Sequence, residues 1–347
     1  MFRQDRTNPS TAVSNWKGRT HTPKAWSSTA VSTWLNGGLF GGGGFLATGG
    51  TESTYGAYKV HTFLSSSNFV IVSGVAPALE VLTVAGGGSM MSYNESAGGG
   101  AGGMKTHSIS AGITASTNTV QVGAGGAFAS SGSSGNKGTD SFLNIGGTTY
   151  SASGGGAAVG GHSSTVNGGS GAGAFNSGNL SYSAGTGISG EGNDGGDGDG
   201  ASGGWGSIVL IGTGGGGGKG STGSAGSTGF GSGPVSGGNG GTGATNDYRT
   251  GSNITYAAGG GGSGFWNHYG TLQNTTAGTG TSYVSGNGNY YNSGAWVNGT
   301  NGTANKGGGG RSGGSGIVVI RYLVCLLYTS DAADDTPCVD LGGRRII

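Results

Sequence analysis

The stretch "GGGGGKGSTGSAGSTG" (Gly214–Gly229) carries glycine at every third position, at six successive places. An extended left-handed helix with three residues per turn has no internal hydrogen bonds. Its backbone N–H and C=O groups must therefore pair with neighbouring chains or with water. Glycines three residues apart would line one edge of such a helix and allow the next helix to approach closely. This spacing predicts a bundle of polyglycine II helices that are hydrogen-bonded sideways.

A flexible linker is the alternative interpretation of the glycine tracts. Glycine loses the most conformational freedom on folding, and it has no side chain whose burial could offset that loss. Order in these tracts would thus have to come from contacts between backbones. Collagen is excluded, because only 5 prolines occur and the glycine period is interrupted.

The composition restricts the class of protein. The chain has 347 residues, enough for two domains or one large one, and 89 of them are glycine. Charged residues make up 8%, and the formal net charge is +1. Such a low charge does not favour a solvated disordered chain, and it gives no electrostatic steering toward nucleic acid.

Short apolar runs, several of which end directly in glycines, predict β-strands. "YKVHTF" (Tyr58–Phe63) and "NFVIV" (Asn68–Val72) flank a serine-rich turn and are interpreted as a hairpin. Helical periodicity is nearly absent, so we expect an all-β protein with little or no α-helix. It would combine a small β-sandwich-like core of short strands with glycine-rich loops and the polyglycine II bundle. The other predicted strands lie within Leu79–Gly88, Asn118–Gly126, Phe142–Gly147, Gly206–Gly215 and Gly316–Val324.

Composition also divides the chain into five expected segments. Residues 1–50 form a polar N-terminal segment for attachment or linkage, and residues 51–126 contain the β-strand core. Residues 127–315 form the polyglycine and loop region, and residues 316–324 form a closing strand. The fifth segment, residues 325–347, differs from all the others.

That last segment, Cys325–Ile347, holds both cysteines and four aspartates but only two glycines. "CLLYTSDAAD" can be written in codons as TGT CTC TTA TAC ACA TCT GAC GCT GCC GAC, which resembles the adapter DNA of sequencing libraries. "CVDLGGRRII" fits the primer end of the same adapter. We therefore expect residues 325–347 to be a translated adapter, and we draw no conclusion on disulfides from the two cysteines.

Four pieces of the sequence together resemble a known family. They are "LATGGTES…YKVHTFLSSSNFVIVSG", "LEVLTVAGGG", "TVQVGAGG" and "GGGGRSGGSGIVVIRY", and they span roughly residues 45–324. Their order resembles the glycine-rich domain of bacteriophage tail fibres and distal tail-tip adhesins. The resemblance implies a small β core, a bundle of polyglycine helices, and variable loops that contact the bacterial surface.

Two aromatic clusters inside glycine loops are the candidate receptor-binding residues. Large aromatic faces beside Asn, Ser and Thr suit sugars or protein surfaces. The alternative is that these rings cap the ends of the bundle or fill a trimer interface. The candidates are Phe265, Trp266, His268 and Tyr269 in "GFWNHYG", and Tyr290, Tyr291 and Trp296 in "NGNYYNSGAWVNG".

The acidic stretch "GEGNDGGDGDG" (Gly190–Gly200) raises the possibility of a calcium site, but it fits no calcium-binding loop pattern. Solvated turn residues are the preferred interpretation. No nucleophile, base and orienting group can be assembled from the sequence. We therefore expect no enzymatic activity, no cofactor and no metal.

Two functions from different classes remain. The first is a virion component, a non-enzymatic tail-fibre or tail-tip adhesin. Its partners would be a bacterial surface glycan or outer-membrane protein and other tail-fibre subunits, possibly as a homo-oligomer, with no nucleic acid and no membrane insertion. The second is a secreted glycine-rich structural protein of a cell wall or matrix, or an ice-binding protein. Neither an apolar run of membrane-spanning length nor a secretory signal is recognisable.

Overall fold

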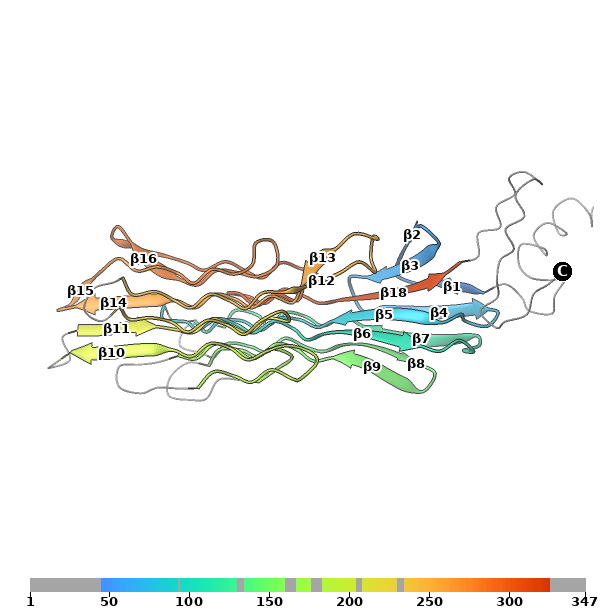
Figure 1. Cartoon of the computed structure of the whole chain (residues 1–347), viewed down its shortest axis with the longest axis horizontal. Coiled ribbons are helices and arrows are strands. Elements are labelled where there is room, and N and C mark those ends of the chain that lie inside the picture. Colours follow the sequence, from blue (N-terminus) through green and yellow to red (C-terminus); the bar gives the residue numbers. More distant parts are fainter. Residues whose placement is uncertain are drawn as a thin grey trace, which may run out of the picture.

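The computed structural model describes residues 45–92, 94–129, 134–159, 167–175, 183–203, 208–229 and 234–324. These residues form an elongated molecule with strands gathered at its two ends and glycine tracts running between them (Figure 1). The described part is all-β and contains no helix, as the sequence predicts. Residues 1–44 of the expected N-terminal segment, and Cys325–Ile347 with its predicted adapter origin, lie outside the described residues.

A β-sandwich of two five-stranded antiparallel sheets forms one end of the molecule. The first sheet has the order β1 (Leu46–Thr48), β4 (Ser67–Ser73), β7 (Ser116–Gln121), β8 (Ser141–Ile145) and β9 (Thr148–Ala152). The second has the order β2 (Thr51–Tyr55), β3 (Tyr58–Phe63), β18 (Ile317–Leu323), β5 (Leu79–Val84) and β6 (Met104–Ile109). Strands β8 and β9 belong to the predicted glycine-rich region 127–315, so the sandwich uses more of the chain than residues 51–126.

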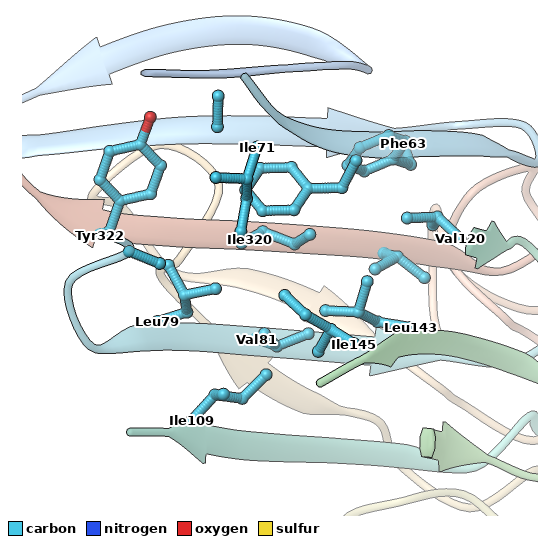
Figure 2. Packing of buried hydrophobic residues seen from close by; sticks show 14 residues of the cluster. Phe63, Ile71, Leu79, Val81, Ile109, Val120, Leu143, Ile145, Ile320 and Tyr322 are labelled. Atoms are coloured by element: carbon cyan, nitrogen blue, oxygen red, sulfur yellow. The ribbon is translucent and has the colours of Figure 1, made fainter. Parts of the chain in front are cut away.

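The sandwich core lies between the two sheets, where side chains from both inner faces interdigitate (Figure 2). The first sheet contributes Phe69, Ile71, Val120, Leu143 and Ile145, among others. The second contributes Phe63, Leu79, Val81, Ile109, Val318, Ile320 and Tyr322. Burial of this apolar surface is the main source of stability at this end of the molecule.

Strand β18 is central in its sheet, with β3 and β5 as its neighbours. Its side chains alternate between two buried faces. Val318, Ile320 and Tyr322 enter the sandwich core, and Ile317 and Val319 enter a second cluster on the opposite face. That second cluster is completed by Tyr256, at the end of the small hairpin β12 (Ala244–Asn246) and β13 (Ile254–Tyr256). Burial on both faces accounts for the apolar run Ile317–Ile320 that begins β18.

Arg321 ties the β12–β13 connection to the second sheet. Its guanidinium lies 3.8 Å from the ring centre of Tyr248 and 4.4 Å from that of Tyr58. Its Nε donates a hydrogen bond to Glu80 at 2.6 Å. A guanidinium between two aromatic faces and a carboxylate satisfies a charge that would otherwise be costly to bury.

The predicted hairpin of Tyr58–Phe63 and Asn68–Val72 is wrong, although both strands exist. Strand β3 pairs with β2 and β18, whereas β4 pairs with β1 and β7. The chain crosses from one sheet to the other after Phe63. Phe63 and Phe69 thereby reach the same core, and burial of both rings between the sheets replaces direct pairing of the strands.

The glycine tracts form a hydrogen-bonded bundle and not a sheet. Residues 85–90 exchange backbone hydrogen bonds with five other segments of the chain, whereas a strand in a sheet has two neighbours. The donors rotate with a period of three. In residues 214–219, the N–H groups of residues three apart donate to the same neighbouring segment, and consecutive residues donate to different ones. The bonds are, donor first, Gly214 to Ala174, Gly215 to Ser224, Gly216 to Gly260, Gly217 to Gly171, Gly218 to Ser221 and Lys219 to Ala257.

This period is that of polyglycine II, which has three residues per turn and bonds only sideways. The six periodic glycines do not lie on a single helix, however, because the stretch turns back near Lys219–Ser221 and forms two antiparallel arms. Within each arm the prediction of one glycine edge is confirmed. A Cβ on Gly214 or Gly217 would overlap the backbone of segment 193–196, and one on Gly223 or Gly226 would overlap that of segment 212–215.

We expect substitution Gly216→Ala to destabilise the bundle by about 3 kcal/mol, because overpacking against a backbone that cannot move is costly. The new Cβ would overlap the carbonyl oxygen of Gly99. The exposed neighbour Ala225 provides the control, and Ala225→Ser should leave the thermal unfolding midpoint unchanged. Equal midpoints for Gly216→Ala and the wild type would contradict this packing.

The sandwich should also lose stability in mild acid, because of buried His61. Its Nδ1 donates to the carbonyl of Gly49 at 2.9 Å, so the Nε2 accepts from the Tyr322 hydroxyl at 3.2 Å. Burial lowers the pKa of His61, with Glu52 acting in the opposite direction. Below about pH 6.5 the unfolded chain then binds a proton that the folded chain does not. The free energy of unfolding therefore decreases as the pH decreases. We expect His61→Gln to reduce the drop in unfolding midpoint between pH 7.5 and pH 5.5, and an unchanged drop would contradict this role.

Candidate functional site

The candidate aromatic residues gather at the end of the molecule opposite the sandwich (Figure 1). Here a four-stranded sheet has the order β10 (Asp199–Gly203), β11 (Ile208–Gly212), β14 (Gly264–His268) and β15 (Thr271–Leu272). A separate hairpin, β16 (Tyr290–Asn292) and β17 (Ala295–Val297), packs beside β14. Both predicted clusters thus belong to one region, which we name the aromatic end, Gly264–Thr276 with Asn287–Gly299.

The two clusters meet through stacked rings. The ring centres of Phe265 and Trp296 lie 6.1 Å apart, and their planes are 6° from parallel. Tyr291 meets Trp296 edge to face, with ring centres 5.6 Å apart. The first contact joins β14 to the β16–β17 hairpin and the second joins the two strands of that hairpin, so all three residues have a packing role.

Thr275 adds a polar connection between the same two elements. Its N–H donates to the carbonyl of Tyr291, and the N–H of Tyr291 donates to its hydroxyl, each at 2.9 Å. Thr275 is buried, and its hydroxyl also donates to the carbonyl of Gly264. One threonine among many carries no signal in the sequence, so Thr275 could not be recognised there as a functional residue.

Trp266 and His268 occupy the face of β14 opposite Phe265, since side chains alternate along a strand. Trp266 lies across from Leu210 of β11, which is buried. The indole N–H of Trp266 is buried and has no hydrogen-bond partner. This half-buried ring therefore packs on the sheet, whereas His268 beyond it is exposed.

Tyr269 is exposed, with 69% of its surface accessible. It forms the two-residue turn between β14 and β15 together with Gly270, and both have positive φ, 50° and 82°. Such turns strongly favour Asn, Asp or Gly, so a tyrosine here is unusual. Its ring meets that of His268 edge to face at 4.8 Å.

Tyr290 is half-buried and lies across from Val297, whose side chain is partly exposed. The seven candidates therefore divide into two groups. Phe265, Trp266, Tyr291 and Trp296 pack within the aromatic end, in keeping with the capping alternative. His268, Tyr269 and one edge of Tyr290 are available to a partner.

Comparison with known proteins identifies the domain type. A family model described as a glycine-rich domain matches residues 62–323. The chain belongs to this glycine-rich domain family. The match spans the interval from β3 to β18, which are adjacent in the second sheet, and so includes the whole bundle. No curated protein matches the chain.

The carboxylates of the acidic stretch in this glycine-rich domain accept hydrogen bonds from the backbone. Glu191, Asp194, Asp197 and Asp199 each accept a hydrogen bond from a backbone N–H of a neighbouring segment, at 2.7 to 3.0 Å. Within the described ranges, no three Asp, Glu, His or Cys side chains are grouped closely enough to hold a metal ion. The carboxylates take the place of carbonyl oxygens at the margin of the bundle.

A hollow of about 430 Å³ lies on the sandwich of the glycine-rich domain, far from the aromatic end. It lies between β7 and the β8–β9 turn, and Ser116, Thr117, Thr119 and Asn144 are among the residues that line it. These groups are polar and uncharged. The hollow contains none of the predicted binding residues. As to the membrane, no helix long and apolar enough to cross one occurs in the residues described.

We expect Trp296→Ala to release the β16–β17 hairpin from β14, because this indole stacks on Phe265 of β14 and also contacts Tyr291 within the hairpin. The amide hydrogens of Thr275 and Tyr291 should then exchange about tenfold faster, corresponding to roughly 1.4 kcal/mol of lost local stability. The exposed Val297 on the same strand gives the control Val297→Ala, which should leave both rates unchanged. The amide of Gly216 inside the bundle should keep its protection in both variants, and loss of protection throughout would contradict a local role.

Proposed function

We propose that this chain is the glycine-rich domain of a bacteriophage tail fibre or tail-tip adhesin. In this proposal it acts without catalysis, as a virion component, and recognises a bacterial surface through the aromatic end. Its partners are a bacterial surface glycan or outer-membrane protein, together with other tail-fibre subunits, possibly copies of itself.

The observation that carries the proposal is that the two ends of the long axis differ. The first and last described residues both lie at the sandwich. Phe45 packs on Tyr322 with ring centres 4.8 Å apart, and the N–H of Val324 donates to Ala57 at 2.8 Å. The aromatic end lies at the far end of the long axis (Figure 1). A domain held at one end and carrying exposed aromatic residues at the other suits an adhesin.

The bundle supports the proposal mechanically. Its segments are joined by backbone hydrogen bonds in several directions, so the aromatic end is carried on a laterally bonded support and not on a loop. Pre-organised binding residues lose less conformational entropy when they engage a partner.

Cell binding tests the proposal. Fluorescently labelled protein should bind at least one strain in a panel of Gram-negative bacteria. The double variant Tyr269→Asn, Tyr290→Ser should bind about tenfold less, since tyrosines at a binding surface are common sources of binding energy.

Tyr283 supplies a matched control. It is also a tyrosine with positive φ, 60°, and is 89% exposed, but its turn packs beside Thr303 and Gly308, away from the aromatic end. Tyr283→Asn should bind like the wild type. Failure of the wild type to bind any strain, or equal loss in Tyr283→Asn, would refute the adhesin and favour a glycine-rich structural protein.

A further inference from the structure

The aromatic end lies in a long uncharged part of the chain. Between Arg249 and Lys306 the sequence contains no Asp, Glu, Lys or Arg. This interval includes β14, β15, β16, β17 and both of their turns. A partner bound here finds no side chain with a fixed charge on these elements.

Two acidic residues of other segments come near this region, the exposed Asp199 and the half-buried Glu95. Asp199 begins β10, and its carboxylate accepts hydrogen bonds from the N–H and the hydroxyl of Thr228, both at 2.9 Å. Glu95 lies in the segment that contacts Asn289, and burial raises the pKa of its carboxyl group. A charged ligand would lose hydration at this surface without gaining an ion pair.

The exposed groups of the two end turns combine apolar and hydrogen-bonding character. Tyr269 presents its ring beside the imidazole of His268, and Thr271 follows in the same turn. The β16–β17 turn presents the amide of Asn292 and the hydroxyl of Ser293. Aromatic faces stack on apolar C–H surfaces, and amides and hydroxyls both donate and accept hydrogen bonds. Neutral sugar rings have that pairing of C–H faces and hydroxyl edges.

The backbone at Tyr269 supports a ligand at this turn only together with the groups around it, since Tyr283 also has a positive φ. A left-handed conformation costs a bulky L-residue of order 1 kcal/mol or more, and Asn or Gly would avoid that cost. The structure nevertheless has a tyrosine there, with its side chain in solvent. The ring contacts the exposed His268 and belongs to neither hydrophobic cluster of the described residues.

We infer that the aromatic end binds an uncharged saccharide chain of the bacterial surface, with Tyr269 as the ring on which a sugar stacks. This inference rests on the proposed adhesin function and narrows its partner from glycan or protein to a neutral glycan. His268 and Thr271 flank Tyr269 in the β14–β15 turn, and Asn292 and Ser293 add hydrogen-bonding groups at the β16–β17 turn.

The first test compares two treatments of a strain that the wild-type protein binds. Periodate, which cleaves vicinal diols of sugars, should abolish binding, and digestion of surface proteins by protease should leave it intact. Binding should change less than about twofold between roughly 0.05 M and 0.5 M NaCl, because there are no charges to screen. Loss of binding after protease but not periodate would overturn the glycan inference and leave the adhesin function standing. A strong decrease with salt would overturn the neutrality of the ligand.

The second test uses variants of the same turn and the matched tyrosine. Tyr269→Asn should reduce binding by about tenfold, although the free energy of unfolding should not fall, since Asn tolerates positive φ. Tyr269→Phe, which keeps the ring, and Tyr283→Asn should retain most of the binding. Full binding by Tyr269→Asn, with the fold intact, would overturn the role of Tyr269. Absence of binding by the wild type to every strain would refute the adhesin function itself, and this inference with it.

Discussion

Sideways hydrogen bonding between backbones that carry no Cβ is the interaction on which the rest of the structure depends. A tract such as residues 85–90 is surrounded by five others, and each peptide group finds its partner in a different segment. A methyl group at Gly87 or Gly216 would occupy the position of a neighbouring carbonyl oxygen. The absence of side chains is therefore what allows the backbones to satisfy their hydrogen bonds without forming a sheet or an α-helix.

The same constraint accounts for the unusual composition. Inside the bundle, glycine with an occasional alanine or serine leaves room for packing against several neighbouring segments. At its margin, side chains that imitate a peptide carbonyl are needed, and Asp, Asn, Ser and Thr supply them. Asp194 accepts from the N–H of Gly187, Asn239 from that of Thr279, and Ser221 from that of Thr242. Lys, Arg and Glu are therefore scarce, since long charged side chains suit neither the interior of the bundle nor its margin.

The bundle also separates two regions that are stabilised by different interactions. The sandwich is stabilised by apolar burial between sheets, and it holds both ends of the described chain. The aromatic end has no such core, and its order comes from stacked rings and from Thr275. Because the support between them bonds through its backbone, residues in the turns of the aromatic end can change without disturbing the bundle. An adhesin that must match different surfaces would benefit from that independence.

The sequence by itself determined the local structure. The predicted strand Tyr58–Phe63 has the same limits as β3, and the glycine period predicted the polyglycine II bundle, because each property depends on residues close together in the chain.

Only the tertiary structure decided which strands pair and which rings meet. The serine-rich turn after Phe63 suits a hairpin and a crossing between sheets equally well, and the choice came from burying Phe63 and Phe69 in one core. The glycine period likewise runs through the reversal at Lys219–Ser221 without a break, so it could not reveal the two arms. Phe265 and Trp296 meet because the path of the chain through the bundle returns β16 and β17 to the side of β14, and no pattern within either cluster encodes that return.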